Sequence, residues 1–303
     1  MKQSPSHLCI LIVLLSASSI AIAQGSSAGS DATDLSTPRS VGTKSYQFVT
    51  AYLSYAPDGS RLGTEETRME CDVTIGMDHR QQLTCHRFEL TDNDGVTKRV
   101  PGLEGWENVM DGQAAEVLGI AHADFQGLTT DDGQPLSPDV AYRVYNTFVD
   151  FYAFNNVFAQ PVPPETGRSI ADLTSMGVEI EHYSAYSEPP VDLGESVKKG
   201  SYFRNGRVTL EWLGNGMVET QTCALVAFDS GESCFQMLME PAPGYAMDVK
   251  GGSHYWGTLF INLDDYWLEK ATFREFVMTR MAMGDEPPMS ALIQRIGTIR
   301  LIR

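Results

Sequence analysis

The sequence predicts an α+β fold that is predominantly antiparallel β, with a curved sheet or half-barrel covered by helices and arranged in two lobes. Three observations support this prediction. Apolar and polar residues alternate along many short segments, clusters of Gly, Asp, Asn and Pro separate those segments, and one stretch has helical periodicity instead. The chain has 303 residues, which is enough for one large domain or two small ones with a real core.

The N-terminus has the three parts of a cleavable secretory signal peptide over residues 1–23. Lys2 gives a positive start, residues 8–15 form a short apolar run, and residues 21–23 (AIA) provide a small-residue cleavage site. Cys9 lies inside the apolar run, which argues against a lipoprotein. The run is too short to span a bilayer, and no later stretch is long and apolar enough. The mature protein is therefore predicted to be exported, to the periplasm or the extracellular space, without a transmembrane segment.

Composition divides the rest of the chain into three parts. Residues 24–43 are rich in Ser, Gly, Thr and Asp and predict a flexible leader, because so few apolar side chains cannot offset the entropy of ordering. Two Pro-containing stretches, 160–167 and 187–196, indicate linkers. We therefore predict an N-terminal β lobe with a helix over residues 44–165 and a C-terminal antiparallel β-meander over residues 166–303.

The N-terminal lobe contains the clearest helix signal, after three predicted strands. The predicted strands are 45–55, 65–75 and 82–91. Ser137 suits the N-cap and Pro138 the first turn of a helix that extends to residue 154. At 100° per residue the polar side chains of this helix form one narrow stripe, which we expect to face solvent, while the other sides are buried. The stripe consists of Asp139, Arg143, Asn146, Thr147 and Asp150.

The C-terminal lobe is predicted to contain six or seven antiparallel strands. In residues 207–212 apolar and polar side chains alternate, and the Asn215-Gly216 pair that follows is a strong hairpin-turn signal. Residues 222–228 are apolar on both faces, which indicates a central strand. Another turn is predicted at Asp264-Asp265.

Four cysteines remain after cleavage, and an even number in an exported chain favours disulfides. Of the three possible pairings, position favours Cys71–Cys85 and Cys223–Cys234, because turn-forming residues lie midway within each pair. Each bridge would then join the two strands of a local hairpin. Zinc is not predicted, since the spacings are far from C-x2-C.

The charge excludes some classes of partner. The formal net charge is −17, and it is near −18 once Lys2 is removed with the signal peptide. A chain this acidic repels phosphate backbones and anionic membrane surfaces, so nucleic acid is not a predicted partner. The charge itself is typical of a soluble surface, although attraction of a cation or a basic partner is an alternative.

No catalytic or cofactor motif is present. There is no G-x-S-x-G elbow, no phosphate loop and no dinucleotide fingerprint, and the histidines are scattered. Residues 91–97 and 129–135 resemble fragments of calcium loops, but both fail the EF-hand pattern at its first position, so we predict turns. A secreted glycosidase needs only two carboxylates, and tryptophans for sugar stacking are available. The catalytic residues of such an enzyme, and any cofactor, are not predicted.

One stretch resembles a known family. Residues 253–279 (SHYWGTLFINLDDYWLEKATFREFVMT) are similar to the hairpin of LolA/LppX-type lipid carriers, in which a strand, an Asp-containing turn and a long returning strand form part of a half-barrel. Gly257 and Asp264 match the rhythm of that hairpin. The resemblance covers about residues 200–303. It implies a curved antiparallel sheet whose apolar concave face, covered by helices, holds lipid.

The leading functional hypothesis is an exported, noncatalytic ligand-binding or carrier protein for a lipid or another apolar molecule. Six apolar side chains of the C-terminal strands are predicted to share one face and to contact this ligand, with the helix at 137–154 as the cover. They are Leu210, Trp212, Phe235, Met237, Leu259 and Ile261. A secreted hydrolase with paired carboxylates is the first alternative, and an envelope structural or interaction protein is the second.

Overall fold

The computed structural model describes residues 33–78, 80–110, 120–189, 197–242, 245–283 and 287–302. The predicted signal peptide and residues 24–32 of the predicted leader lie outside this part of the chain. The strands are β1 (Gly42–Tyr55), β2 (Arg61–Ile75), β3 (Gln81–Thr91), β4 (Thr97–Arg99), β5 (Glu107–Met110), β6 (Glu179–Glu181), β7 (Tyr202–Arg204), β8 (Thr209–Val218), β9 (Gln221–Asp229), β10 (Ser233–Ala242), β11 (Tyr245–Asn262), β12 (Leu268–Met283) and β13 (Met289–Ile302). The helical elements are α1 (Pro138–Tyr152), the π-helical turn η3 (Ala153–Val157) and the 3-10 turns η1 (Pro101–Leu103), η2 (His122–Phe125) and η4 (Ile170–Asp172).

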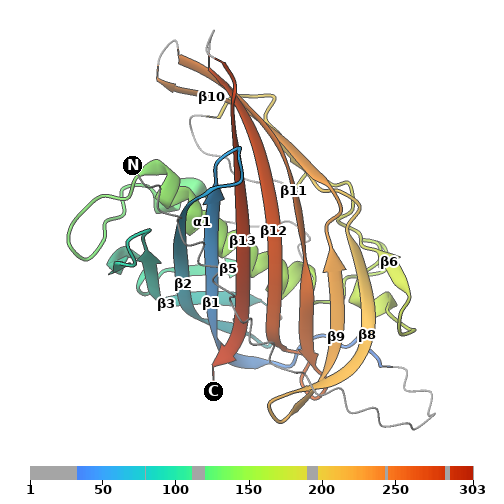
Figure 1. Cartoon of the computed structure of the whole chain (residues 1–303). Coiled ribbons are helices and arrows are strands. Elements are labelled where there is room, and N and C mark those ends of the chain that lie inside the picture. The colour runs from blue at the N-terminus through green and yellow to red at the C-terminus, as the bar shows by residue number, and fades with distance from the viewer. Residues whose placement is uncertain are drawn as a thin grey trace, which may run out of the picture. The chain divides into compact units, whose positions relative to one another are not determined.

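One antiparallel sheet joins the described strands. Its main path is β4-β3-β2-β1-β13-β12-β11-β9-β8-β6, with β5 beside β3, β10 beside β11 and β7 beside β10. The first and last long strands, β1 and β13, are neighbours, from Ser45 opposite Ile302 to Tyr55 opposite Leu292. The segments predicted as two lobes therefore meet within one sheet. The predicted α+β fold, predominantly antiparallel β with a helix, is confirmed (Figure 1).

The inner face of the sheet is the one against which α1 packs. In β1 it carries alternate residues, all buried, whereas most of the intervening residues are half-exposed. This alternation follows from the two-residue period of a strand. The inner-face residues of β1 are Tyr46, Phe48, Thr50 and Tyr52, and those opposite them on β13 are Leu301, Ile299, Gly297 and Arg295. The face is therefore apolar at the Tyr46 end and polar at the Tyr52 end.

Aromatic rings hold α1 against the sheet. The ring centroids of Phe148 and Phe88 on β3 lie 5.8 Å apart in a stacked arrangement. Phe151 meets Tyr46 edge-on at 5.6 Å. Such pairs add roughly 0.5–1.5 kcal/mol each beyond the area they bury. The helix predicted over 137–154 is confirmed, and its dense aromatic content is core.

The prediction that the polar stripe of this helix faces solvent holds at Asp139, which is exposed, but is wrong further along the helix. Thr147 is fully buried, and its hydroxyl lies 3.0 Å from the hydroxyl of Thr67 on β2. Arg143 and Asp150 also turn toward the sheet, where Asp150 accepts a hydrogen bond from Arg295. The reason is that the inner face of the sheet is polar where these residues meet it. Its polar side chains therefore form the hydrogen bonds and ion pairs that water would form with an exposed stripe.

The predicted turn at Asn215-Gly216 is also wrong, because both residues lie within β8. The register of β8 against β9 shifts between Trp212 and Gly214, where Gly214 has a φ of 117°. A bulge therefore absorbs the glycine, and β8 continues to a tight turn at residues 219–220. The turn at Asp264-Asp265 and the placement of β9 between two neighbouring strands are confirmed.

The four mature-chain cysteines are free thiols in the structure. Cys71 lies directly opposite Cys85 in the ladder between β2 and β3. Directly opposite residues in an antiparallel pair have Cα atoms about 4.5–5.5 Å apart, which suits a disulfide. The bridge between Cys71 and Cys85 therefore stays a prediction.

The pairing of Cys223 with Cys234 is contradicted by the strand register. Cys223 on β9 lies opposite Asn262 of β11, whereas Cys234 on β10 lies opposite Gly252 of the same strand. Ten residues of a strand span about 33 Å, far beyond the reach of a disulfide. The residues predicted as a turn between these cysteines do connect two strands, β9 and β10. These strands do not pair with each other as a hairpin, because each pairs with a different part of β11.

The predicted flexible leader ends earlier than residue 43. Leu35 is buried in the core, and the guanidinium of Arg39 lies 5.5 Å from the ring centroid of Trp267. The indole of Trp267 donates a hydrogen bond to the backbone carbonyl of Ser40 at 3.1 Å. The buried Leu35, the contact of Arg39 with Trp267 and the hydrogen bonds of Ser40 thus attach residues 33–41 to the sheet.

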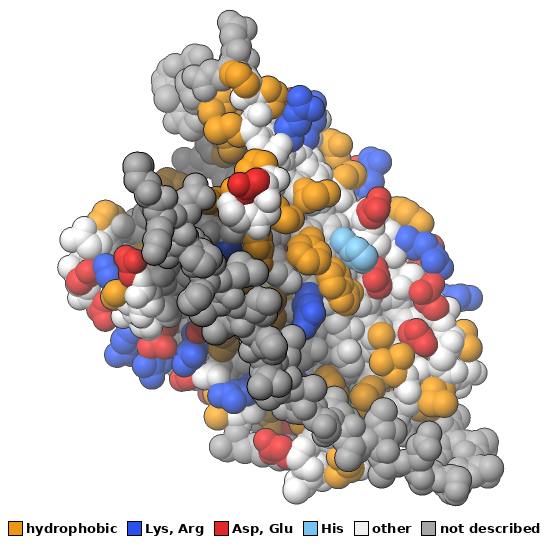
Figure 2. All heavy atoms as spheres, in the orientation of Figure 1, with side chains coloured by type: hydrophobic (Ala, Val, Ile, Leu, Met, Phe, Trp, Pro, Cys, Tyr) orange, Lys and Arg blue, Asp and Glu red, His pale blue; other side chains and the backbone are white. Residues whose placement is uncertain are grey.

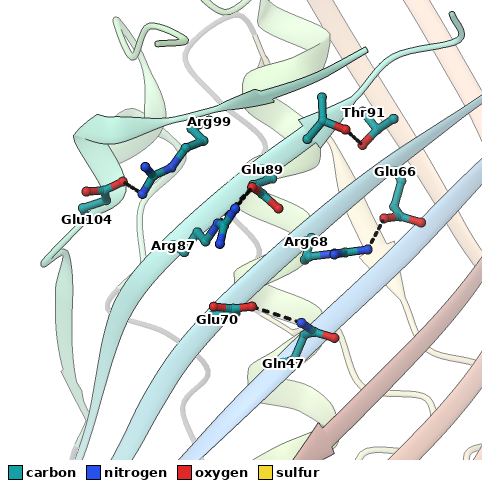
Figure 3. A network of polar contacts seen from close by, with 10 residues as sticks. Gln47, Glu66, Arg68, Glu70, Arg87, Glu89, Thr91, Arg99 and Glu104 are labelled. Atoms are coloured by element: carbon teal, nitrogen blue, oxygen red, sulfur yellow. Dashed lines mark hydrogen bonds and ion pairs between the residues drawn. The ribbon is translucent and has the colours of Figure 1, made fainter. Parts of the chain in front are cut away.

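The outer face of the sheet differs between its two halves. Over β1–β3 it is polar, with Arg68 paired to Glu66 at 3.2 Å and Gln47 donating to Glu70 at 3.1 Å (Figure 3). Over β11–β13 apolar side chains gather on the surface (Figure 2). They include Trp256, Phe276, Met278 and Ile296, the last three exposed.

Candidate functional site

The six predicted ligand-contacting residues share the inner face but lie at two places on it. Leu210, Trp212, Leu259 and Ile261 are buried beside β9, where Leu259 is opposite Val226 and Val226 opposite Trp212. Phe235 and Met237 lie opposite Gly251 and Val249. The two groups are therefore separated by about eight residues of β11, or roughly 27 Å. They do not form one site.

The inner face around the first group is filled by aromatic side chains. Phe158, which follows η3, stacks on Phe228 of β9 with 5.5 Å between ring centroids, and Phe154 stacks on Phe273 of β12 at 4.8 Å. Such contacts are typical of close-packed interiors. The inner face beside β9, where the sequence predicted a bound ligand, is therefore occupied by packed core side chains.

A cleft of about 240 Å3 lies where the start of α1 crosses the ends of β2 and β3. Its apolar wall comes from two β3-side residues, Leu90 and Val96, and from Leu136 and Val140 at the start of the helix. Its polar end includes Tyr52 of β1, Glu65 of β2 and Arg143 of α1. Concave, mainly apolar sites with a few polar groups are the usual form of small-molecule sites, although most are somewhat larger.

Tyr52 lines this cleft and has a buried polar group that lacks a partner among the described residues. Its side chain is 6% exposed, and its hydroxyl makes no hydrogen bond within the described part of the protein. The guanidinium groups of Arg143 and Arg295 lie 5.8 Å and 5.5 Å from the centroid of its ring, which fixes the ring in place. A buried hydroxyl without a hydrogen bond costs about 1–3 kcal/mol, so a ligand that bonds to it recovers part of that cost.

The charged side chains that line the cleft already have partners within the protein. Glu65 pairs with Arg143, and Lys98 pairs with Asp132 at 2.8 Å. Glu66 pairs with Arg68, while Asp92 accepts hydrogen bonds from two backbone amides of its own turn. The lining therefore favours a ligand with a neutral polar group over a charged one.

A row of polar side chains extends from the cleft across the inner face. Glu65, Tyr52, Arg295, Glu275 and Tyr255 lie directly opposite one another on β2, β1, β13, β12 and β11. Arg295 lies 2.8 Å from Glu275 and also binds Asp150 of α1, so one guanidinium serves two carboxylates. Burial raises the pKa of Glu275 to about 7.

This row is not among the features predicted from the sequence, although a signal for it is present. Arg295 is in phase with Gly297, Ile299 and Leu301 on the inward side of its strand. Glu275 is likewise in phase with Ala271 and Phe273. A charged residue at an inward position of a strand with alternating apolar residues is the pattern that could have indicated Arg295 and Glu275.

A second hollow of about 370 Å3 lies at the other end of β1. It is lined by polar side chains such as Gln221, Asn262 and Glu269, and Lys44 there pairs with Asp265 at 2.8 Å. Asn262 donates to Glu269 at 2.8 Å. This hollow lacks the apolar wall of the cleft, so the cleft is the better candidate site.

The other predicted features are structural. Asp92 accepts hydrogen bonds from the amides of Asp94 and Val96, which closes the predicted turn at 91–97. His254, on the outer face, lies 2.9 Å from Asp229. Among the described residues, no three His, Cys, Asp or Glu side chains gather as a metal site. No helix in the described ranges is long and apolar enough to cross a membrane.

Comparison with protein-family models finds no match, and neither does comparison with curated proteins. Among solved structures, the chain is similar to OmpTdeltaL8, a loop L8 deletion mutant of OmpT, an outer membrane protein of Vibrio cholerae. The identity is 8% and the TM-score 0.24, over 86% of this chain and 99% of that one. At such a TM-score the likeness supports no statement about this chain.

Proposed function

We propose that the protein is an exported, noncatalytic binding protein that holds a small, neutral, amphipathic molecule in the cleft at the start of α1. The observation that carries this proposal is the buried side chain of Tyr52, which lines the partly apolar cleft and whose hydroxyl has no partner within the described residues. The ligand's apolar part would lie against Leu90, Leu136 and Val140, and its polar group would bond to Tyr52.

The finer architecture belongs to the same proposal. The sheet would act as a half-barrel around α1, and the two predicted lobes would be its two halves, joined through β1 and β13. The lipid suggested by the LolA/LppX-type resemblance would then be a small one, because the volume of the cleft is about 240 Å3. Cleavage after residue 23 would deliver the chain to the periplasm or the extracellular space.

The carboxylates of the cleft do not support the hydrolase alternative. Glu65 and Glu66 both line it, but each is paired with an arginine, and consecutive strand residues point to opposite faces. One observation favours an interaction protein instead, namely the exposed apolar side chains of Phe276, Met278 and Ile296 on the outer face.

The neutral fluorescent probe N-phenyl-1-naphthylamine tests the proposed site. We expect saturable binding with a rise in fluorescence, and we expect Tyr52→Phe to weaken it roughly three- to tenfold, the effect of losing one neutral hydrogen bond. Fluorescence titration gives both affinities.

Tyr46→Phe is a matched control for this experiment. Tyr46 is on the same face of the same strand, and its hydroxyl is equally buried and without a hydrogen bond, but it does not line the cleft. We expect Tyr46→Phe to bind the probe as the wild type does. Equal weakening by both changes, or the lack of saturable binding, would favour the interaction protein.

A further inference from the structure

The strands β10–β13 extend past α1 (Figure 1). Six methionines lie together on the inner face of this extension. Met247 of β11 is at the centre of this methionine cluster. It lies directly opposite Met239 on one side and Met283 on the other. The next inner-face positions along the strands hold Met237, Val249, Met281 and Met289, which are again opposite one another.

Strand geometry brings these thioethers within reach of one another. Directly opposite residues have Cβ atoms about 4.5–5.5 Å apart, and diagonal neighbours lie about 7–8 Å apart. Met247 therefore has two methionines beside it and two more, Met237 and Met281, on its diagonals. Methionine has three rotatable side-chain bonds, so several sulfur atoms can turn toward one point above Met247.

Methionine is an unusual residue for so many neighbouring strand positions. Strands favour β-branched and aromatic residues, and the inner face beside α1 is built largely from these. The chain has 13 methionines, and about half of them occupy this one end of the sheet. The other described inner-face residues around them are Phe235, Val249, Gly251, Thr279 and Ala291. None of these is charged, so the thioethers are the strongest metal ligands on this surface.

We propose that the methionine cluster binds a soft monovalent metal ion, Cu(I), through the thioether sulfur atoms around Met247. Thioethers select Cu(I) among the common biological metals, whereas Zn2+, Ca2+ and Mg2+ require imidazole, thiolate or oxygen ligands. A neutral ligand set suits an ion of single charge, because little charge has to be desolvated. This site is separate from the cleft and does not depend on a ligand there.

Silver(I) is a suitable probe, since it has the ligand preferences of Cu(I) and is not oxidised in air. The mature protein is used with Cys234→Ser, because Cys234 is the exposed thiol among the described cysteines. We expect one Ag(I) per chain by calorimetric titration, and chemical-shift changes in 13C-methyl NMR signals of the cluster methionines. Bicinchoninate competition then gives the Cu(I) affinity.

Substitution by leucine separates metal binding from apolar contact. Leucine conserves volume and apolar character, so the variants Met239→Leu, Met247→Leu and Met281→Leu should fold, singly or together. The triple variant should nevertheless bind Ag(I) at least tenfold more weakly than the wild type. Met278→Leu, on the outer face, is the matched control and should not change the affinity. Unchanged binding in the triple variant, or methyl shifts confined to methionines outside the cluster, would overturn the proposal. Binding of N-phenyl-1-naphthylamine should be equal in all these variants, so it reports on the cleft independently.

Discussion

Replacing Arg295 with methionine is expected to lower the free energy of unfolding by about 3–5 kcal/mol. The side chain of Arg295 is 11% exposed, and it pairs with Glu275 and with Asp150 of α1. Its removal leaves the buried carboxylate of Glu275 and the partly buried one of Asp150 without a cation, and the cost of an uncompensated buried charge exceeds the value of the pair itself. Urea denaturation at pH 8, where Glu275 is ionised, measures the difference.

Two further variants show whether the charges cause this loss. Arg274→Met, on the exposed outer face of the neighbouring strand, is the matched control and is expected to change stability by less than about 0.5 kcal/mol. Adding Glu275→Gln and Asp150→Asn to Arg295→Met should restore most of the lost stability. A triple variant as unstable as the single one would show that packing, and not charge, is responsible.

The second large effect is a dependence of stability on pH that comes from Glu275. Its pKa is raised by burial from 4.5 to about 7 in the folded protein. The folded state therefore binds the proton more tightly than the unfolded state, and stability falls as the pH rises from about 5 to about 8. A pKa difference of this size between the folded and unfolded states changes the free energy of unfolding by roughly 3 kcal/mol.

Glu275→Gln resembles the protonated side chain and should remove this contribution. We expect the variant and the wild type to be about equally stable at pH 5 and the variant to be more stable at pH 8. Thr272→Val, on the outer face of β12, removes no titratable group and should keep the wild-type dependence. If Glu275→Gln retained the full dependence on pH, another group would have to cause it.

The sequence predicted most of the strands and the helix because these elements follow from local patterns. The helix over 137–154 could be recognised from Pro138 and from its periodicity, both of which depend on neighbouring residues. The direction of its polar stripe could not, because polar stripes face solvent in most helices. Here Thr147 and Asp150 meet Thr67 and Arg295, which are distant in sequence.

The errors about turns and bridges have a common physical cause. Asn215-Gly216 is a strong turn signal, but a bulge beside Gly214 absorbs the glycine within β8. The turn between Cys223 and Cys234 was recognised, yet a turn signal does not say whether the strands on either side of it pair together. In this sheet β9 and β10 both pair with β11, and that pairing depends on residues distant in the sequence from the turn.

The candidate site was beyond sequence analysis because its parts come from separate segments. Tyr52 belongs to β1, Leu90 to β3, Leu136 to a loop and Val140 to α1. The six side chains that were predicted to bind ligand do share one face, as their alternation indicated. Four of them are buried in the same core cluster as Phe154 and Phe158, and alternation alone does not distinguish a covered face from an open one.

The central claim, that the cleft holds the ligand, is tested most directly by filling the cleft. Val140→Trp places a large side chain in it, and Val149→Trp, at a half-buried valine on the same helix outside the cleft, is the matched control. We expect saturable binding of N-phenyl-1-naphthylamine to be lost in Val140→Trp and kept in Val149→Trp, in proteins whose circular dichroism matches the wild type. Undiminished binding by Val140→Trp would place the ligand elsewhere and contradict the claim.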